Sequence, residues 1–248
     1  MSTEERKLRQ RDEREHLILR VGRKMLIERG YLGLNMDRIA QEIEYSKGIV
    51  YQHFSSKEDM LCAMTIEMLG DMLGLFRRAV EFRGRTRERI AAVATAAQLQ
   101  FRLNPDHLQA QQILWIASIA HKASNERRLE LDRLDAQAIG LFEQLIDAAV
   151  ADGDLTVPKG IEPQQLVYGM WSMMIGAEVL GYDPSHEIVF GKLNFGRAVR
   201  RNLQTFLDGL GWQPLSSDWD YEKTVRRVLQ TVFHDEWSDL KRKGLELM

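Results

Sequence analysis

The chain has 248 residues, 44% of them hydrophobic, a net charge of −2 and a single cysteine, Cys62. This composition allows a sizeable core, excludes an intrachain disulfide and favours the reducing cytoplasm. The charged residues 1–14 do not resemble a signal peptide, and no apolar run approaches the roughly 20 residues of a membrane-spanning helix. Few prolines and no alternating runs of β-branched residues predict an all-α fold.

The charge is distributed unevenly along the chain. Residues 1–57 carry 12 Lys and Arg against 9 Asp and Glu, a net +3, and residues 58–248 carry 22 against 27, a net −5. This asymmetry has the sign expected of a DNA-binding head on an acidic body, but its size does not establish one.

Three helices separated by short turns are predicted near the N-terminus, over residues 15–29, 36–43 and 46–54. Gly30 is the expected C-cap of the first helix, and Asn35 is the expected N-cap of the second. The second and third helices would form the two-helix corner of a helix-turn-helix. Residues 1–14 form a charged arm that either extends the first helix or is disordered.

Seven longer helices are predicted in the remainder, which brings the total to about ten. Their approximate spans are 57–82, 86–103, 105–122, 125–153, 163–180, 192–210 and 218–242. We interpret the chain as three parts: a helix-turn-helix domain over 1–56, an effector-binding and dimerisation domain over 57–217, and a helical extension over 218–248. The extension is expected to pack on the body or to enlarge a dimer contact.

The third helix has two chemically distinct faces. Val50 and Phe54 lie four residues apart and are predicted to share the buried face, which turns Gly48 and Gln52 outward. The amide of Gln52 matches an adenine edge, and Ile49 could contact a thymine methyl. Donors suited to phosphate oxygens surround them: Ser46, Lys47, Tyr51, His53 and Lys57. On this chemistry alone, a DNA-reading helix and a plain surface helix remain equally good interpretations.

A family resemblance favours the first interpretation. The strings Asn-Met-Asp-Arg-Ile-Ala at 35–40, Tyr-Ser-Lys-Gly-Ile-Val-Tyr-Gln-His-Phe at 45–54 and Ser-Lys-Glu at 56–58 closely resemble the N-terminal domain of the TetR family of bacterial regulators. The resemblance covers residues 13–62. It implies that the DNA contacts are made by Ser46, Lys47, Gly48, Tyr51, His53 and Lys57.

The sequence departs from the family pattern at three positions. Asn35 replaces the usual Thr or Ser and is an acceptable cap. Glu44 stands where the family has glycine, and a residue forced to positive φ there costs about 1 kcal/mol. Ile49 is larger than the usual residue, which changes the expected base preference and not the fold.

The resemblance also implies a body that dimerises through the last two helices of the common family fold, here 163–180 and 192–210, and holds a small molecule between its helices. An apolar effector pocket is predicted around Trp115, Met170, Trp171, Met173 and Met174. Plain core packing is the alternative for each of these residues. Glu178 is expected either to contact a cationic ligand or to pair with Arg197 or Arg200 across the dimer.

The expected function is a repressor that a small, mostly apolar ligand releases from a palindromic operator in double-stranded DNA. The alternative is a DNA-bound regulator or scaffold that is controlled by a protein partner. We expect no enzyme, because no nucleophile elbow, phosphate loop or paired carboxylates occur. No cofactor or metal is expected, since the histidines are scattered, and Cys62 is expected to be a buried structural residue and not a redox sensor.

Overall fold

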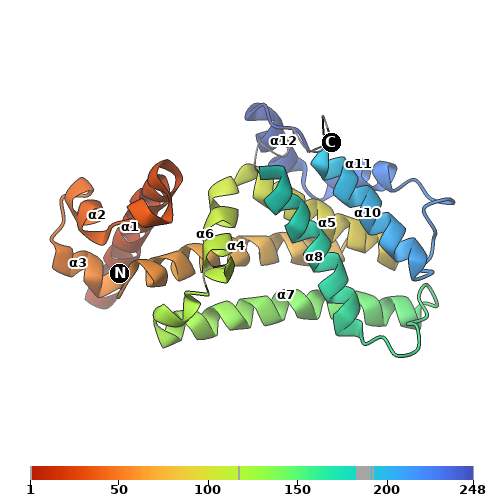
Figure 1. Cartoon of the computed structure of the whole chain (residues 1–248), viewed down its shortest axis with the longest axis horizontal. Helices are drawn as coiled ribbons and strands as arrows, with labels where there is room; N and C mark the ends of the chain where they lie inside the picture. The colour runs from red at the N-terminus through yellow and green to blue at the C-terminus, as the bar shows by residue number, and fades with distance from the viewer. Residues whose placement is uncertain (1, 117, 183–190, 192, 248) are drawn as a thin grey trace. The chain divides into compact units, whose positions relative to one another are not determined.

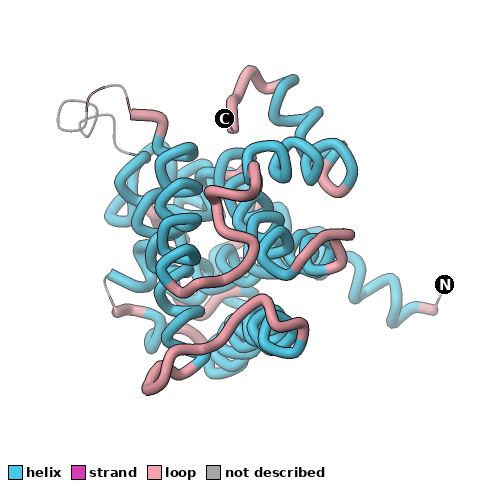
Figure 2. Tube along the Cα trace, turned by 90° about the vertical axis from the view of Figure 1, so that its right-hand side faces the viewer, coloured by secondary structure: helices cyan, strands magenta, loops and turns pink. Residues whose placement is uncertain are grey.

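The computed structural model describes residues 2–116, 118–182, 191 and 193–247. Within these ranges the chain forms eleven α-helices and one short 3-10 helix joined by loops, and no strand, which confirms the predicted all-α fold (Figure 2). None of these helices is long and apolar enough to cross a membrane. The chain divides into two compact units, Met1–Gly70 with Asn104–Leu134 and Asp71–Leu103 with Asp135–Met248, so that α4 and α7 contribute residues to both.

The first unit contains the helix-turn-helix (Figure 1). Its elements are α1 (Thr3–Gly33), α2 (Met36–Glu42), α3 (Lys47–His53), the first part of α4 (Lys57–Val80), α6 (Pro105–Ile116), the 3-10 helix Ala120–Lys122 and the start of α7 (Asn125–Ala151).

The charged N-terminal arm is helical, which decides between the two interpretations of this segment. Ser2 caps α1, because its hydroxyl accepts a hydrogen bond from the Glu5 amide at 3.1 Å and the Glu5 carboxylate accepts one from the Ser2 amide at 2.7 Å. Near the other end of α1 the helix is interrupted at Gly30, whose φ of 64° and ψ of −178° favour glycine, and a last turn follows to Gly33 before the C-cap Leu34. The helix predicted over 15–29 is therefore longer at its N-terminus than its apolar pattern indicated.

The second unit is built around α5 (Thr86–Leu103), which is buried along most of its length. The other helices are the end of α4, the end of α7, α8 (Pro163–Tyr182), α10 (Phe195–Gly209), α11 (Tyr221–Thr231) and α12 (His234–Arg242). α8, α10, α11 and α12 all contact α5. The ring of Phe142 on α7 makes edge-to-face contacts with Phe76 on α4 at 5.8 Å and with Trp171 on α8 at 6.2 Å between centroids.

The predicted extension differs from the structure in one respect. Instead of one helix over 218–242, the chain forms α11 and α12 with a break at Val232 and Phe233. Phe233 is fully buried, and its ring lies 5.1 Å from the guanidinium of Arg78. The break turns this ring into the core of the second unit, so the extension packs on the body through both helices.

Other helix ends also differ from the prediction. The helix predicted over 105–122 ends at Ile116, and the 3-10 helix follows after a turn. α10 begins at Phe195, capped by Asn194, and not at residue 192, which lies outside the described residues. The sequence also predicts a break over 181–185, of which residues 183–185 lie outside the described residues, as does His186, one of the scattered histidines.

Candidate nucleic-acid interface

The turn between α2 and α3 is closed by two backbone hydrogen bonds. The Tyr45 amide donates to the Ala40 carbonyl at 3.0 Å, and the Glu44 amide donates to the Gln41 carbonyl at 3.2 Å. This is the Schellman pattern, and it places Glu44 at the position that glycine usually occupies. Glu44 has a φ of 58°, so the expected left-handed conformation is present.

The two predicted faces of α3 have the expected exposure. Val50 and Phe54 are fully buried, together with Ile39 of α2, and they fix α3 to the core of the first unit. Gly48 and Gln52 are exposed on the opposite face. A Cβ on Gly48 would meet only the Ser46 hydroxyl, at 3.9 Å, so the surface above this glycine is open to an approaching ligand.

The N-terminal ends of α2 and α3 lie together. The side chain of Asn35 caps α2 by accepting from the Arg38 amide at 3.1 Å, as expected. Ser46 occupies the N-cap position of α3 but makes no side-chain capping bond, so its exposed hydroxyl is available to another acceptor. Lys47 forms an exposed ion pair with Asp37, whose hydrogen bond raises the pKa of the lysine.

A groove of about 460 Å³ connects several of the predicted contact residues. It is lined by Leu32, Leu34, Asn35, Met36, Asp37, Tyr51, Ser55, Ser56 and Lys57. The ring of Tyr51 is 50% exposed beside it. The groove therefore combines the Lys57 ammonium with the hydroxyl groups of Tyr51, Ser55 and Ser56, which all suit a phosphate.

Tyr31 positions Lys57, a role that the sequence patterns did not reveal. The Lys57 ammonium lies 3.9 Å from the centre of the Tyr31 ring and donates to the Tyr31 carbonyl at 3.3 Å. The Tyr31 hydroxyl donates to Glu58 at 2.7 Å. Burial, together with this hydrogen bond, raises the pKa of Tyr31 to about 12. The lysine is therefore held in place before any ligand binds.

His53 is placed differently from the other predicted contacts. Its side chain is 5% exposed, and its Nδ1 lies 3.2 Å from Glu15 Oε2. Arg127, at the start of α7, donates to the other oxygen of Glu15 at 2.9 Å. Burial raises the pKa of Glu15, but the hydrogen bonds from Arg127 and His53 outweigh it and leave this pKa below its usual value. Glu15 and Arg127 were not recognised from the sequence.

The predicted effector residues are divided between the two units. Trp115 is on α6 in the first unit and is partly exposed, whereas the four aromatic and sulfur-containing residues on α8 belong to the second. Among these, Met170 and Met174 are buried, and Trp171 and Met173 are half-buried. A cavity beside Met174 and Glu178 has a volume of about 10 Å³, which is room for about one water molecule.

Glu178 lies against this small cavity. Its burial raises its pKa, and the charge of Arg102 only partly opposes the rise. Arg200, one of its predicted partners, lines the same cavity but is bound within the chain, donating to Gln98 at 3.0 Å and pairing with Glu222 at 3.2 Å.

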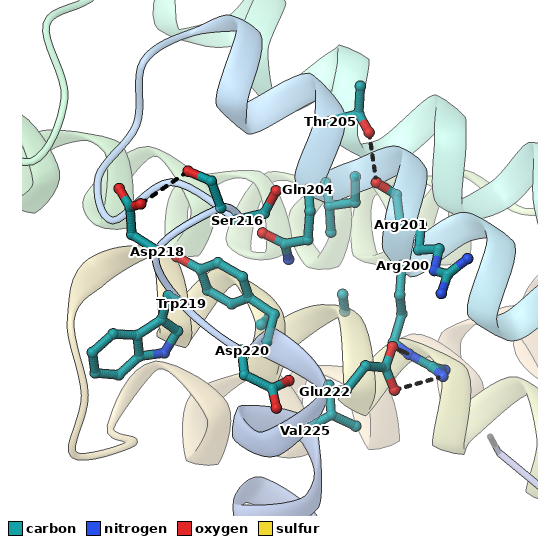
Figure 3. A pocket seen from close by; sticks show the side chains of 15 residues that line it. Arg200, Arg201, Gln204, Thr205, Ser216, Asp218, Trp219, Asp220, Glu222 and Val225 are labelled. Carbon is teal, nitrogen blue, oxygen red and sulfur yellow. Dashed lines mark hydrogen bonds and ion pairs between the residues drawn. The ribbon is translucent and has the colours of Figure 1, made fainter.

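A larger open groove of about 720 Å³ adjoins this cavity, sharing Ala94, Arg200 and Leu203 with it, and lies between α10, α5 and residues 216–225 (Figure 3). Ala91, Ala94, Leu203 and Val225 give it apolar walls, and Arg201, Asp218 and Asp220 give it charged ones. Its volume is in the range of small-molecule sites. The sequence analysis did not identify it, because it depends on the packing of the extension.

The described residues bear on two expectations, one about metal ligands and one about the thiol of Cys62. Among those residues no three His, Cys, Asp or Glu side chains are grouped as metal ligands would be. Cys62 is fully buried, and burial raises the pKa of its thiol to about 11. A buried thiol of this kind is poorly reactive, in agreement with the structural role expected for it.

Comparison with known proteins connects this geometry to a family. Residues 18–64 match the family model of "Bacterial regulatory proteins, tetR family". The chain is 27% identical over 157 residues, 56% of its length and 72% of the relative's, to the HTH-type transcriptional activator FasR of Mycolicibacterium smegmatis. It is 23% identical over 193 residues, 78% of its length and 89% of the relative's, to the HTH-type transcriptional repressor KstR2 of Rhodococcus jostii.

Two solved structures have a similar fold. The TetR-family regulator PfmR of Thermus thermophilus aligns with a TM-score of 0.59 at 21% identity, covering 78% of this chain and 98% of PfmR. FadR of Bacillus subtilis, solved in complex with stearoyl-CoA, aligns with a TM-score of 0.58 at 14% identity, covering 78% and 98%. All four names describe transcriptional regulators and not enzymes.

Proposed function

We propose that the chain is a TetR-type DNA-binding transcriptional regulator and, more specifically, a cytoplasmic, homodimeric repressor; the match of residues 18–64 to the family model supports the first part. In this proposal it binds a palindromic duplex and is released by a small, mostly apolar effector. The observation that supports the DNA-binding part most is α3, which exposes Gly48 and Gln52 over a fully buried face. Its relatives include both an activator and a repressor, so the direction of control is part of the proposal.

Within this proposal, Gln52 and Ile49 contact base edges, and Gly48 allows the backbone to come close to them. The phosphate contacts are made by Asn35, Ser46, Lys47, Tyr51 and Lys57, which border the groove or the N-terminal end of α3. His53 contributes through its buried pairing with Glu15 more than through a free ring. The Lys47 ammonium exchanges its exposed partner Asp37 for a phosphate oxygen on binding.

The test begins with selection of bound duplexes from a random-sequence library, which should yield a palindromic site. Binding of that duplex is then measured against salt concentration. Lys57→Gln should weaken binding to every sequence and reduce the salt slope by about one unit. Gln52→Ala should instead relax the preference at one base pair, by about 1–3 kcal/mol.

The matched control is Gln41→Ala, which removes an exposed amide from α2 in the same unit. It should change neither the salt slope nor the base preference. An equal loss of binding to selected and random duplexes after Gln52→Ala would contradict base reading by α3.

The dimer is proposed to form through α8 and α10. These helices pack against each other, and α8 leaves large apolar side chains exposed in the single chain, with Tyr168 75% exposed and Val179 and Leu180 also exposed. Tyr168→Asp should therefore give a monomer in sedimentation experiments. Leu129→Asp makes the same kind of change at another large exposed apolar residue, on α7, and should leave the dimer intact.

The effector is proposed to bind the second unit. Two places are available: the small cavity beside Met174 and Glu178, which would have to widen, and the open groove of Figure 3. Because the FadR structure holds stearoyl-CoA, that compound is the first probe. Stearoyl-CoA should release the selected duplex. Met174→Trp fills the small cavity and Thr205→Trp fills the open groove, and the variant at the place that binds the effector should abolish release without changing duplex affinity. Duplex binding that neither this nor any other acyl probe alters would favour control by a protein partner.

A further inference from the structure

Arg127 lies at the C-terminal end of α3, although 74 positions separate it from His53 in the sequence. Its guanidinium donates to the His53 carbonyl at 3.2 Å and lies 4.8 Å from the centre of the Phe54 ring. His53 is the last residue of α3, and Phe54 is its C-cap. A cation at this end satisfies a carbonyl that the helix leaves open and opposes the helix dipole.

The same guanidinium is held by two carboxylates from different helices. It donates to Glu15 on α1 at 2.9 Å and lies 3.4 Å from Asp59 on α4. Asp59 is buried, and it also accepts from the Ser124 amide at 3.0 Å and the Ser124 hydroxyl at 2.8 Å. Burial raises the pKa of Asp59, but these hydrogen bonds outweigh it and lower the pKa.

The contacts of Ser124 and Arg127 therefore join the first turn of α7 to α1, α3 and α4 within one compact unit. Both residues lie well outside the segment 18–64 that matches the family model. The side chain of Arg127 is only 20% exposed, so most of it is committed to protein contacts and not offered to DNA.

We propose that Arg127 is a positioning residue for DNA binding: it fixes the C-terminal end of α3 against α1 and α4, and thereby sets the affinity for the operator without contacting DNA. This inference depends on the proposed function, since α3 must be the DNA-reading helix. Arg127 stands on a helix that continues beyond this unit to Ala151, so α7 belongs to both compact units.

The test compares Arg127→Gln with Arg133→Gln. Arg133 has the same charge on the same helix, but it is exposed, and within the part of the chain that the structure describes its ion pair is with Glu130, one turn away. Arg127→Gln should weaken binding of the selected duplex at least about fivefold, the lower end of typical couplings between sites. The salt slope should stay unchanged, and amide hydrogen exchange should accelerate in residues 50–54 and not in α2. Arg133→Gln should leave all three measurements at the wild-type values.

Three results would overturn the proposal. Equal binding by the two variants would remove the positioning role, and a salt slope that falls by about one unit would make Arg127 a direct phosphate contact. Failure of the wild-type protein to select any duplex would remove the proposed function as well, which distinguishes the two failures.

If Arg127→Gln does not fold, Arg127→Lys decides the question. Lysine keeps the charge beside Glu15 but lacks the planar fork that reaches two acceptors together. It should retain the fold and still bind the duplex more weakly than Arg133→Lys does. Equal binding by these two lysine variants would also overturn the proposal.

Discussion

Replacing Glu44 by glycine should stabilise the helix-turn-helix. Glu44 holds a φ of 58° in the Schellman turn, and a left-handed residue with a Cβ costs about 1–2 kcal/mol. Glycine removes this cost but adds about 0.5–1 kcal/mol of conformational entropy to the unfolded chain. Among the described residues the exposed carboxylate has no hydrogen bond or ion pair to lose. The expected net gain is therefore about 0.5–1 kcal/mol.

Amide hydrogen exchange over residues 35–54 without DNA measures this gain locally, because 0.5–1 kcal/mol corresponds to about two- to fivefold slower exchange. Glu44→Ala removes the same charge and keeps the Cβ, so its exchange should match the wild type. Gln41→Gly places a glycine inside α2, where it should accelerate exchange about fivefold. Faster exchange in Glu44→Gly than in Glu44→Ala would refute the argument from backbone strain.

Three further predictions concern charges and the thiol. Asp37→Asn should tighten duplex binding by at most about fivefold in a binding titration, because Lys47 then no longer has to give up its ion pair with Asp37 when it binds a phosphate. Folding lowers the pKa values of Glu15 and Asp59. Both carboxylates therefore stabilise the protein fully above their unfolded-state pKa values, and this stabilisation is lost as the pH falls through their folded-state pKa values. The difference in thermal midpoint between wild type and Glu15→Gln should therefore shrink from pH 6 to pH 3; a constant difference would contradict this. Cys62, whose pKa is about 11, should react with a disulfide reagent at pH 8 only under unfolding conditions, and rapid labelling of the native protein would show that its burial is incomplete.

The sequence by itself determined the local features of the DNA-binding head. The four-residue spacing of Val50 and Phe54 predicted the buried face of α3, and both are fully buried. The cap at Asn35 was predicted from residue type and position, and the positive φ at Glu44 was predicted from the family pattern. These features depend on backbone geometry over one or two helical turns, so neighbouring residues contain the information that specifies them.

The tertiary structure alone decided how distant residues meet. No spacing in the sequence indicated that Tyr31 would hold Lys57 or that Arg127 would hold the end of α3. The same is true of the break at Phe233, which depends on space in the core beside Arg78. Local periodicity shows that a residue faces inward, but the volume left between Met174 and Glu178 depends on every element packed around them. The head was therefore predictable because it is specified locally, whereas the contacts that complete it and the space for an effector arise only from packing.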